Sequence, residues 1–321
     1  MTKLYPWLLP TWESWKQNLD QDRLSGSMLL HAAQGMGVDK LLEQFSQAVM
    51  CRNYPSEACG FCHSCDLMKS HSHPDVHWIK PEKLGKGITV DQIRQANQLA
   101  QGKSHLNGYR LIIIEPAEAM NESASNALLK TLEEPGAQCL FLLVAHQMDK
   151  LLPTIVSRCQ QWHIPQPQTD VVHQWAQAQT TKTVPSFAAS LANHSPLHTL
   201  ALVEDGEISQ YTQLERVFIE QLQQGVIMPT TLWNEVSSDV EVKLNWLCHL
   251  LIDTQKYHFG LRDDYLMPGA KSLAQVINYT QTYQVTSLLL EVIAQLSTYA
   301  GLNAELIVTN WILQSQEVIC S

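Results

Sequence analysis

Two short runs in the first half of the chain are apolar almost without interruption. Arg110–Ile114 is apolar after its first residue, and Cys139–Ala145 is apolar throughout. Such runs are typical of central strands in a parallel sheet that helices cover on both faces. Further β-rich runs alternate with helical patterns around them, which is the order of α/β proteins. We therefore predict an α/β domain with a five-stranded parallel sheet, whose strands are Ser27–His31, Asp75–Ile79, Arg110–Ile114, Cys139–Ala145 and Gln161–Ile164.

Helical patterns fill the gaps between these strands and dominate the rest of the chain. Those of the first half are Asp39–Val49, Val90–Gly102, Glu122–Glu134 and Lys150–Val156. Asn121 or Ser123 can cap the third of them. The sequence Pro-Gln-Pro at 165–167 indicates a boundary, and no convincing strand follows it. Three short helices are expected between residues 168 and 205, and longer ones over Tyr211–Gln224, Val240–Tyr257, Lys271–Thr282 and Val285–Gln316, the last broken near Gly301.

A cluster of cysteines predicts a metal site. Cys51, Cys59, Cys62 and Cys65 are spaced C-x7-C-x2-C-x2-C, and four thiolates complete the tetrahedral shell of a structural Zn²⁺. The alternatives are disulfides, which fit poorly with a cytosolic chain, or an iron–sulfur cluster, whose usual spacings differ. Four histidines nearby could replace a ligand but are expected to be ordinary surface or turn residues: His63, His71, His73 and His77. The remaining cysteines are interpreted as small buried apolar residues: Cys139, Cys159, Cys248 and Cys320.

The net charge of −10 is unevenly placed along the chain. Residues 1–165 carry 15 Lys and Arg against 16 Asp and Glu, whereas residues 166–321 carry 6 against 15. Binding to phosphates depends on Lys and Arg, so we expect no DNA binding through bulk charge and a protein partner for the second half. No apolar run approaches the ~20 residues of a membrane helix, and the N-terminus makes a poor signal peptide. We therefore expect a cytoplasmic protein without membrane contact.

The turn after the first predicted strand occupies the place of a Walker A loop, G-x-x-x-x-G-K-[ST]. Ala32 stands in the place of the first glycine, Gly37 keeps the second, and Val38 stands in the place of the phosphate-binding Lys, with Gly35 as a further glycine of the turn. Asp39 stands in the place of the Mg²⁺-binding hydroxyl and would direct a carboxylate at the phosphates. The alternative is a glycine-containing turn that is unrelated to nucleotides. Either interpretation predicts that this loop does not bind ATP.

The third predicted strand ends where a Walker B strand would supply Asp-Glu, with the Asp on Mg²⁺ and the Glu activating water. Glu115 stands in the Asp position and Pro116 in the Glu position, and proline has no base to offer. Two separate parts of an ATP site are therefore defective in one chain.

Three passages resemble the AAA+ module of bacterial clamp-loader subunits of DNA polymerase III. They are the cysteine cluster after the first helix, Asn126-Ala-Leu-Leu-Lys-Thr-Leu-Glu-Glu-Pro135, and Leu152-Pro-Thr-Ile-Val-Ser-Arg-Cys159. Degenerate Walker motifs beside an intact Ser157-Arg158-Cys159 are similar to the subunit type that does not hydrolyse ATP, rather than to gamma/tau. The motifs cover about half of the chain, and the helical remainder agrees in length and pattern only.

The resemblance implies a role for Arg158 and a set of domains and partners. In this family the Arg of Ser-Arg-Cys reaches into a neighbour's ATP site as an arginine finger in trans, so we expect no intrinsic ATPase in this subunit of a nucleotidyltransferase complex. The expected domains are an AAA+ domain (1–166) with a zinc module (about 51–65), a helical lid (167–207) and a helical collar (208–321). The expected partners are gamma/tau and delta subunits in a hetero-pentamer, and through it the sliding clamp and primer–template DNA. Glu133 and Glu134 are interpreted as solvated residues at a helix end.

Two other functions stay open at this point. The chain could be an active, gamma-like AAA+ ATPase with unusual motifs, against which Val38, Asp39 and Pro116 argue. It could also be a zinc-dependent nucleic-acid-binding module, which the near-neutral first half does not favour.

Overall fold

The computed structural model describes residues 3–83, 85–106, 108–136, 138–299 and 301–320. The chain divides into two compact units, Met1–Gln166 and Pro167–Ser321. Within the described residues, no helix is both long and apolar enough to span a membrane.

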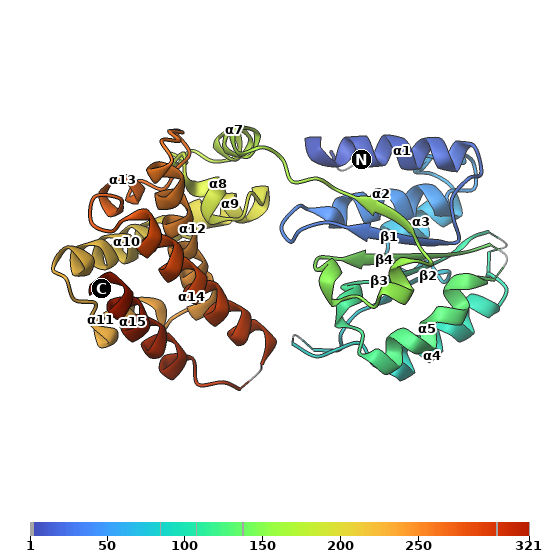
Figure 1. The fold of residues 1–321 in the computed structure, drawn as a ribbon. Helices are drawn as coiled ribbons and strands as arrows, with labels where there is room; N and C mark the ends of the chain where they lie inside the picture. The colour runs from blue at the N-terminus through green and yellow to red at the C-terminus, as the bar shows by residue number, and fades with distance from the viewer. Residues whose placement is uncertain (1–2, 84, 107, 137, 300, 321) are drawn as a thin grey trace. The chain divides into compact units, whose positions relative to one another are not determined.

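The first unit is built on the predicted five-stranded parallel sheet, in the order β2-β3-β4-β1-β5 (Figure 1). The central strands β3 and β4 are fully buried, as their apolar sequences predict. Three strands have the predicted bounds, whereas β2 begins one residue later and β5 lies one residue earlier. The strands are β1 (Ser27–His31), β2 (Val76–Ile79), β3 (Arg110–Ile114), β4 (Cys139–Ala145) and β5 (Gln160–His163).

Helices cover both faces of this sheet (Figure 1). On one face, α4 and α5 enclose an apolar core that includes Ile93, Leu128 and Phe141. On the other face, Trp15 of α1 packs on Phe45 of α2 with ring centroids 4.6 Å apart. The helices of this unit are α1 (Leu9–Asp20), α2 (Val38–Met50), α3 (His63–Lys69), α4 (Val90–Gln101), α5 (Glu122–Glu133) and α6 (Pro153–Val156), with 3₁₀ turns η1 (Pro6–Leu8), η2 (Ala117–Ala119) and η3 (Met148–Lys150).

Local capping signals explain where these helices begin. Asn121 accepts a hydrogen bond from the Ala124 N–H at 2.8 Å and caps α5, as predicted. The predicted helix Lys150–Val156 ends where α6 ends, but its predicted start is wrong, because a 3₁₀ turn ends at Lys150 and α6 begins at Pro153. Proline suits a first helical position, where its missing N–H leaves no bond unmade.

In its described residues the second unit contains helices and no strand. Its larger apolar core includes Tyr211, Phe218 and Trp311, and a smaller cluster joins Ala176, Val184, Ala188 and Val203. The three short helices predicted between 168 and 205 are present as α7–α9. The predicted helix Lys271–Thr282 is wrong, because α13 ends at Leu273 and a capping box between Asn278 and Gln281 begins α14. The helices are α7 (Thr169–Gln179), α8 (Ala188–Leu191), α9 (Pro196–Glu204), α10 (Glu207–Gln223), α11 (Pro229–Val236), α12 (Val240–His258), α13 (Ala270–Leu273), α14 (Tyr279–Thr298) and α15 (Ala304–Cys320).

Candidate metal centre and nucleotide-site remnants

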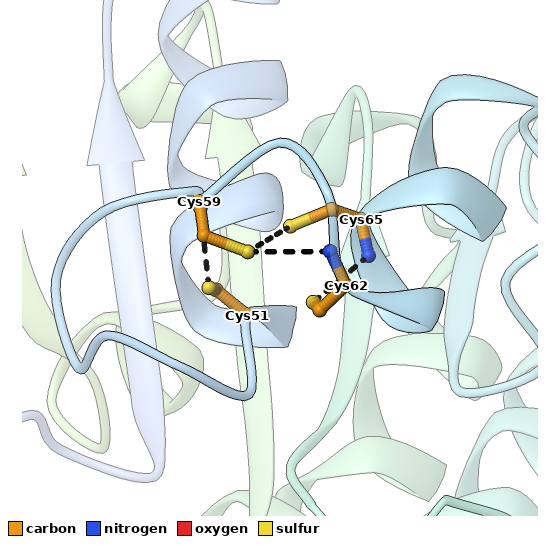
Figure 2. Close-up of side chains that lie close together, drawn as sticks. All are labelled: Cys51, Cys59, Cys62 and Cys65. Atoms are coloured by element: carbon orange, nitrogen blue, oxygen red, sulfur yellow. Dashed lines mark hydrogen bonds between the residues drawn. The ribbon is translucent and has the colours of Figure 1, made fainter.

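The four clustered cysteines converge on one point beside the sheet (Figure 2). Cys51 directly follows α2, Cys59 lies in the next loop, Cys62 caps the N-terminus of α3, and Cys65 lies in its first turn. Their Sγ atoms all lie within 4.8 Å of one another. In the part of the chain that the structure describes, no second group of His, Cys, Asp and Glu side chains meets in this way.

The sulfur separations fit a tetrahedral zinc shell. Sulfurs bound at about 2.3 Å from a tetrahedral Zn²⁺ are about 3.8 Å apart, and the Cys59 and Cys65 Sγ atoms are 3.8 Å apart. A disulfide would need about 2.05 Å, and all four residues are free cysteines. The structure thus brings together the four predicted ligands at a spacing that suits one metal ion.

Backbone N–H groups stabilise the thiolate form of three of these cysteines (Figure 2). Cys51 Sγ accepts from the Cys59 N–H at 3.3 Å, Cys59 Sγ from the Cys62 N–H at 3.4 Å, and Cys62 Sγ from the Cys65 N–H at 3.4 Å. Desolvation raises the pKa of these three thiols, but the N–H donors lower the pKa by more, so each lies below its ordinary value. Burial and the neighbouring sulfurs raise the pKa of Cys65 to about 12, and coordination to a metal would remove that proton.

A buried hydrogen-bond chain fixes α3 to the end of α2 and to the start of β2. The Asp75 N–H donates to His73 Nδ1 at 3.2 Å, so Nε2 carries the proton of the neutral ring. His73 Nε2 lies 2.8 Å from Ser64 Oγ, which donates to the Met50 carbonyl at 2.6 Å. Burial lowers the pKa of His73, in agreement with a neutral imidazole. His73 is therefore a buried residue that supports the cysteine cluster, not the surface or turn residue that was expected. No pattern in the sequence indicates its partner Ser64.

A buried ion pair joins the residue before β2, Asp75, to the first residue of β3, Arg110. The side chains of Asp75 and Arg110 are 1% and 4% exposed, and Asp75 Oδ1 lies 3.2 Å from Arg110 Nη2. Asp75 also accepts from the backbone N–H groups of His105 at 2.8 Å and Leu106 at 3.0 Å. These donors satisfy a charge that would otherwise be costly to bury.

The loop in the Walker A position places apolar side chains where a phosphate loop needs polar ones. Gly35 and Gly37 have φ of 73° and 67°, which glycine adopts without strain, and α2 begins at the next residue. Met36 is fully buried and Val38 is 5% exposed. Asp39, in the first turn of α2, is the charged residue nearest to this loop along the chain. Val38, in the position of the Walker lysine, has no ammonium group that could bind a phosphate.

The N-terminal segment packs on this loop. The Trp7 indole N–H donates to the Met36 carbonyl at 2.8 Å, and the ring of Trp7 stacks on that of Tyr5. Lys40 lies two positions after the Walker lysine position, and its Nζ is 3.9 Å from the centroid of the Tyr5 ring. This cation–π contact keeps Lys40 on the aromatic pair.

The Walker B position is also occupied by other contacts. β3 leads into Glu115, whose carboxylate pairs with Lys80 at 2.9 Å, and then into Pro116. Further along, Glu118 Oε1 accepts from the His146 N–H at 3.0 Å, just after β4. Glu115, Pro116 and Glu118 therefore do not form the Asp-Glu pair that would hold Mg²⁺ and activate water.

Arg158 lies just after α6 and is held by the end of α5. Its Nε donates to Glu133 Oε1 at 2.7 Å, its Nη2 lies 2.5 Å from the same oxygen, and its Nη1 donates to the Thr154 carbonyl at 3.0 Å. Glu133 is half-exposed at the end of α5, as expected, and its pairing with Arg158 is an addition that the sequence did not predict. Burial raises the pKa of the adjacent Cys159 to about 12, so that thiol is an inert packing residue.

Comparison with known proteins gives consistent matches along the chain. The family described as "DNA polymerase III, delta subunit" matches residues 9–168, and "DNA polymerase III, delta subunit, C terminal" matches residues 206–317. The DNA polymerase III subunit delta' of Haemophilus influenzae is 38% identical over 68% of this chain and 67% of that protein. The protein of the same name from Yersinia pestis is 32% identical over 96% of this chain and 94% of that protein. Among solved structures, a gamma subunit-related protein of Thermotoga maritima aligns with 96% of this chain and 99% of its own, at 17% identity and a TM-score of 0.43.

Proposed function

The chain belongs to the delta-prime subunits of bacterial DNA polymerase III, and we propose that it serves the clamp loader without binding ATP itself. Membership of this family confirms the resemblance to clamp-loader subunits that the sequence motifs indicated. The observation that carries the proposal is the buried apolar side chain of Val38 in the position of the Walker lysine. A phosphate chain placed at this loop would meet no cation from that position.

Electrostatics add to the loss of the lysine. Asp39 lies in the first turn of α2, where a phosphate would otherwise be attracted by the helix N-terminus. Two like unit charges about 4 Å apart repel by roughly 4 kcal/mol at an effective dielectric constant near 20. Lys40 is engaged by the Tyr5 ring, so it does not replace the missing Walker lysine. Glu115, in the position of the Walker B Asp, is paired with Lys80.

Arg158 acts, in this proposal, on the ATP site of a neighbouring subunit. Guanidinium is permanently charged and presents a fork of N–H groups that matches phosphate oxygens. An arginine finger stabilises the charge that develops on the transferred phosphoryl group. The Arg158 side chain is 32% exposed at the end of a short helix, which leaves it accessible to a partner. A subunit that binds no nucleotide can thus complete the ATP site of a neighbouring subunit.

The cysteine cluster serves, in this proposal, as a structural zinc module. The ligands Cys51, Cys59, Cys62 and Cys65 would fill all four positions of the ion, so that no site remains for water or substrate. Bound Zn²⁺ would hold the loop between α2 and α3 in one conformation. The chain's own Ser64–His73 hydrogen bonds support the same geometry from behind.

The helical second unit provides the surface for assembly with gamma/tau and delta subunits into a hetero-pentamer. Several large apolar side chains on α14 and α15 are exposed, among them Leu290 at 50%, Leu306 at 67% and Leu313 at 53%. Exposed apolar side chains of this kind are typical of interaction sites. Sliding clamp and primer–template DNA would be engaged through the assembled complex.

The test is ATP hydrolysis by a clamp loader reconstituted with this subunit carrying Arg158→Ala. We expect normal assembly in size-exclusion chromatography, and slower hydrolysis and clamp loading, because a trans finger contributes only to the transition state. Unchanged rates in a properly assembled complex would refute the finger. Arg158→Lys is the matched variant: it keeps the charge but not the fork, and it should recover little activity.

A further inference from the structure

Glu133 holds the guanidinium of Arg158 from one side only. Its Oε1 atom lies 2.7 Å from Nε and 2.5 Å from Nη2, and the Thr154 carbonyl takes a bond from Nη1 at 3.0 Å. Arginine has five N–H groups, one on Nε and two on each terminal nitrogen. These three contacts leave one N–H on Nη1 and one on Nη2, the two nitrogens that form the end of the fork.

Helix stability does not account for a carboxylate at this position. Glu133 is the last residue of α5, where the helix dipole disfavours an anion. The pair is half-exposed, with Glu133 at 50% and Arg158 at 32%, and such pairs contribute little to folding. What the contact does achieve is orientation, since it restricts a long side chain with several rotatable bonds to one direction.

We propose that Glu133 is the positioning residue of the arginine finger. This inference rests on the proposed function, because it presumes that Arg158 reaches a neighbour's ATP. Glu133 fixes the plane of the guanidinium from the Nε side, and the free N–H pair at the end of the fork is presented to two phosphate oxygens. Positioning of this kind lowers the cost of ordering the finger when the subunits close on ATP.

The experiment measures ATP hydrolysis by the reconstituted clamp loader in which this subunit carries Glu133→Ala. We expect kcat to fall about 3- to 5-fold, in line with what a half-exposed charged pair supports, with KM for ATP unchanged. Glu133→Gln keeps an acceptor oxygen for Nε and Nη2, and it should restore most of the lost rate. Glu134→Gln is the matched control, because it removes the same charge one residue further on, and it should leave kcat unaltered.

A second pair of variants separates this inference from the function on which it rests. In the Arg158→Ala background, Glu133→Ala should cause no further loss, because there is no finger left to orient. An equal loss in both backgrounds would mean a structural role and would overturn the inference. So would an unchanged or raised kcat for Glu133→Ala alone, since a raised rate would make Glu133 a restraint on the finger.

The remaining outcomes are equally decisive. If Arg158→Ala leaves hydrolysis unchanged, the proposed finger itself fails and the role of Glu133 fails with it. If Glu133→Gln loses as much as Glu133→Ala, orientation by hydrogen bonds is refuted. Should the alanine variant assemble poorly in size-exclusion chromatography, Glu133→Ser provides the truncation instead.

Discussion

Replacement of Asp75 by Asn should destabilise the first unit far more than the loss of an ordinary surface charge. The carboxylate is 1% exposed and pairs with Arg110, which is 4% exposed. The N–H groups of His105 and Leu106 donate to different oxygens of Asp75, so the single amide oxygen of asparagine could accept only one of these bonds. The substitution would also leave the Arg110 charge buried without a counter-ion. Breaking a buried pair from one side costs about 3–5 kcal/mol. Because Asn keeps part of the hydrogen bonding, we expect the lower end of that range.

Differential scanning calorimetry is the appropriate assay, because it can resolve the unfolding transitions of the two units. A loss of about 3 kcal/mol corresponds to a fall in Tm of roughly 6–12 °C for a unit of this size. Asp91→Asn is the matched control: it removes an exposed carboxylate, 78% accessible, that pairs with Arg94 at 2.9 Å. The control should cost less than about 1 kcal/mol. If Asp75→Asn lowers Tm no more than Asp91→Asn, the buried pair does not stabilise the unit and the reasoning is wrong.

The pH dependence of this effect has a defined sign. Burial raises the pKa of Asp75, but the N–H groups of His105 and Leu106 and the Arg110 guanidinium lower it by more, so the folded-state pKa lies below the ordinary value of 3.8. The stabilisation is therefore fully present above about pH 4 and is lost as the pH falls through the folded-state pKa. The difference in stability between the native chain and Asp75→Asn should shrink accordingly in acid.

Three further perturbations test other parts of the account. Metal analysis of chain purified without chelator should find about one zinc per chain, and Cys62→Ser should lower that content; a native chain free of metal would contradict the zinc assignment. Tyr211→Phe removes a buried hydroxyl that donates to Glu215 at 2.5 Å, so the second unit should lose about 1–2 kcal/mol in calorimetry, and a loss near zero would show that the bond is not needed. Leu306→Asp places a charge on an exposed apolar side chain of α15 and should weaken assembly with gamma and delta subunits by about tenfold or more in a binding titration, whereas unaltered affinity would exclude this face from the interface.

The sheet could be predicted closely because its signals are local. β3 and β4 are buried on both faces, so their sequences are continuous apolar runs, and their bounds follow from the sequence alone. β5 has one partner strand and an exposed sequence, Gln160–His163, which explains why its predicted bounds are displaced by one residue. Edge strands have weaker patterns because only part of their surface is buried.

The predicted helix boundaries were wrong where a second helix-start signal lies inside an apolar pattern. Pro153 begins α6 inside the predicted helix Lys150–Val156. The Asn278–Gln281 capping box likewise begins α14 inside the predicted helix Lys271–Thr282. α1 carries a comparable signal, with Pro10 near its start and Trp12 and Trp15 at helical spacing, and could have been predicted on that basis.

In the candidate site, too, the contacts that are local in the sequence could be predicted and those between distant residues could not. The four cysteines of the candidate metal site lie within one short segment, so their spacing alone predicts that they meet. Glu133 ends α5 and Arg158, 25 residues later, follows α6, so only the packing of α5 against α6 brings them together. The contact of Ser64 with His73 likewise depends on how α3 folds back toward β2. No spacing rule describes such contacts, so the residues that support a site from elsewhere in the chain could not be predicted from the sequence.

Equilibrium binding of ATP with Mg²⁺ to the purified single chain tests the central claim most directly. Isothermal titration calorimetry extended to millimolar nucleotide should detect no binding, because Val38 replaces the phosphate-binding lysine and Asp39 repels the phosphates. Saturable binding at micromolar ATP would contradict the account, and the chain would then have to be treated as a motor subunit with its own nucleotide site.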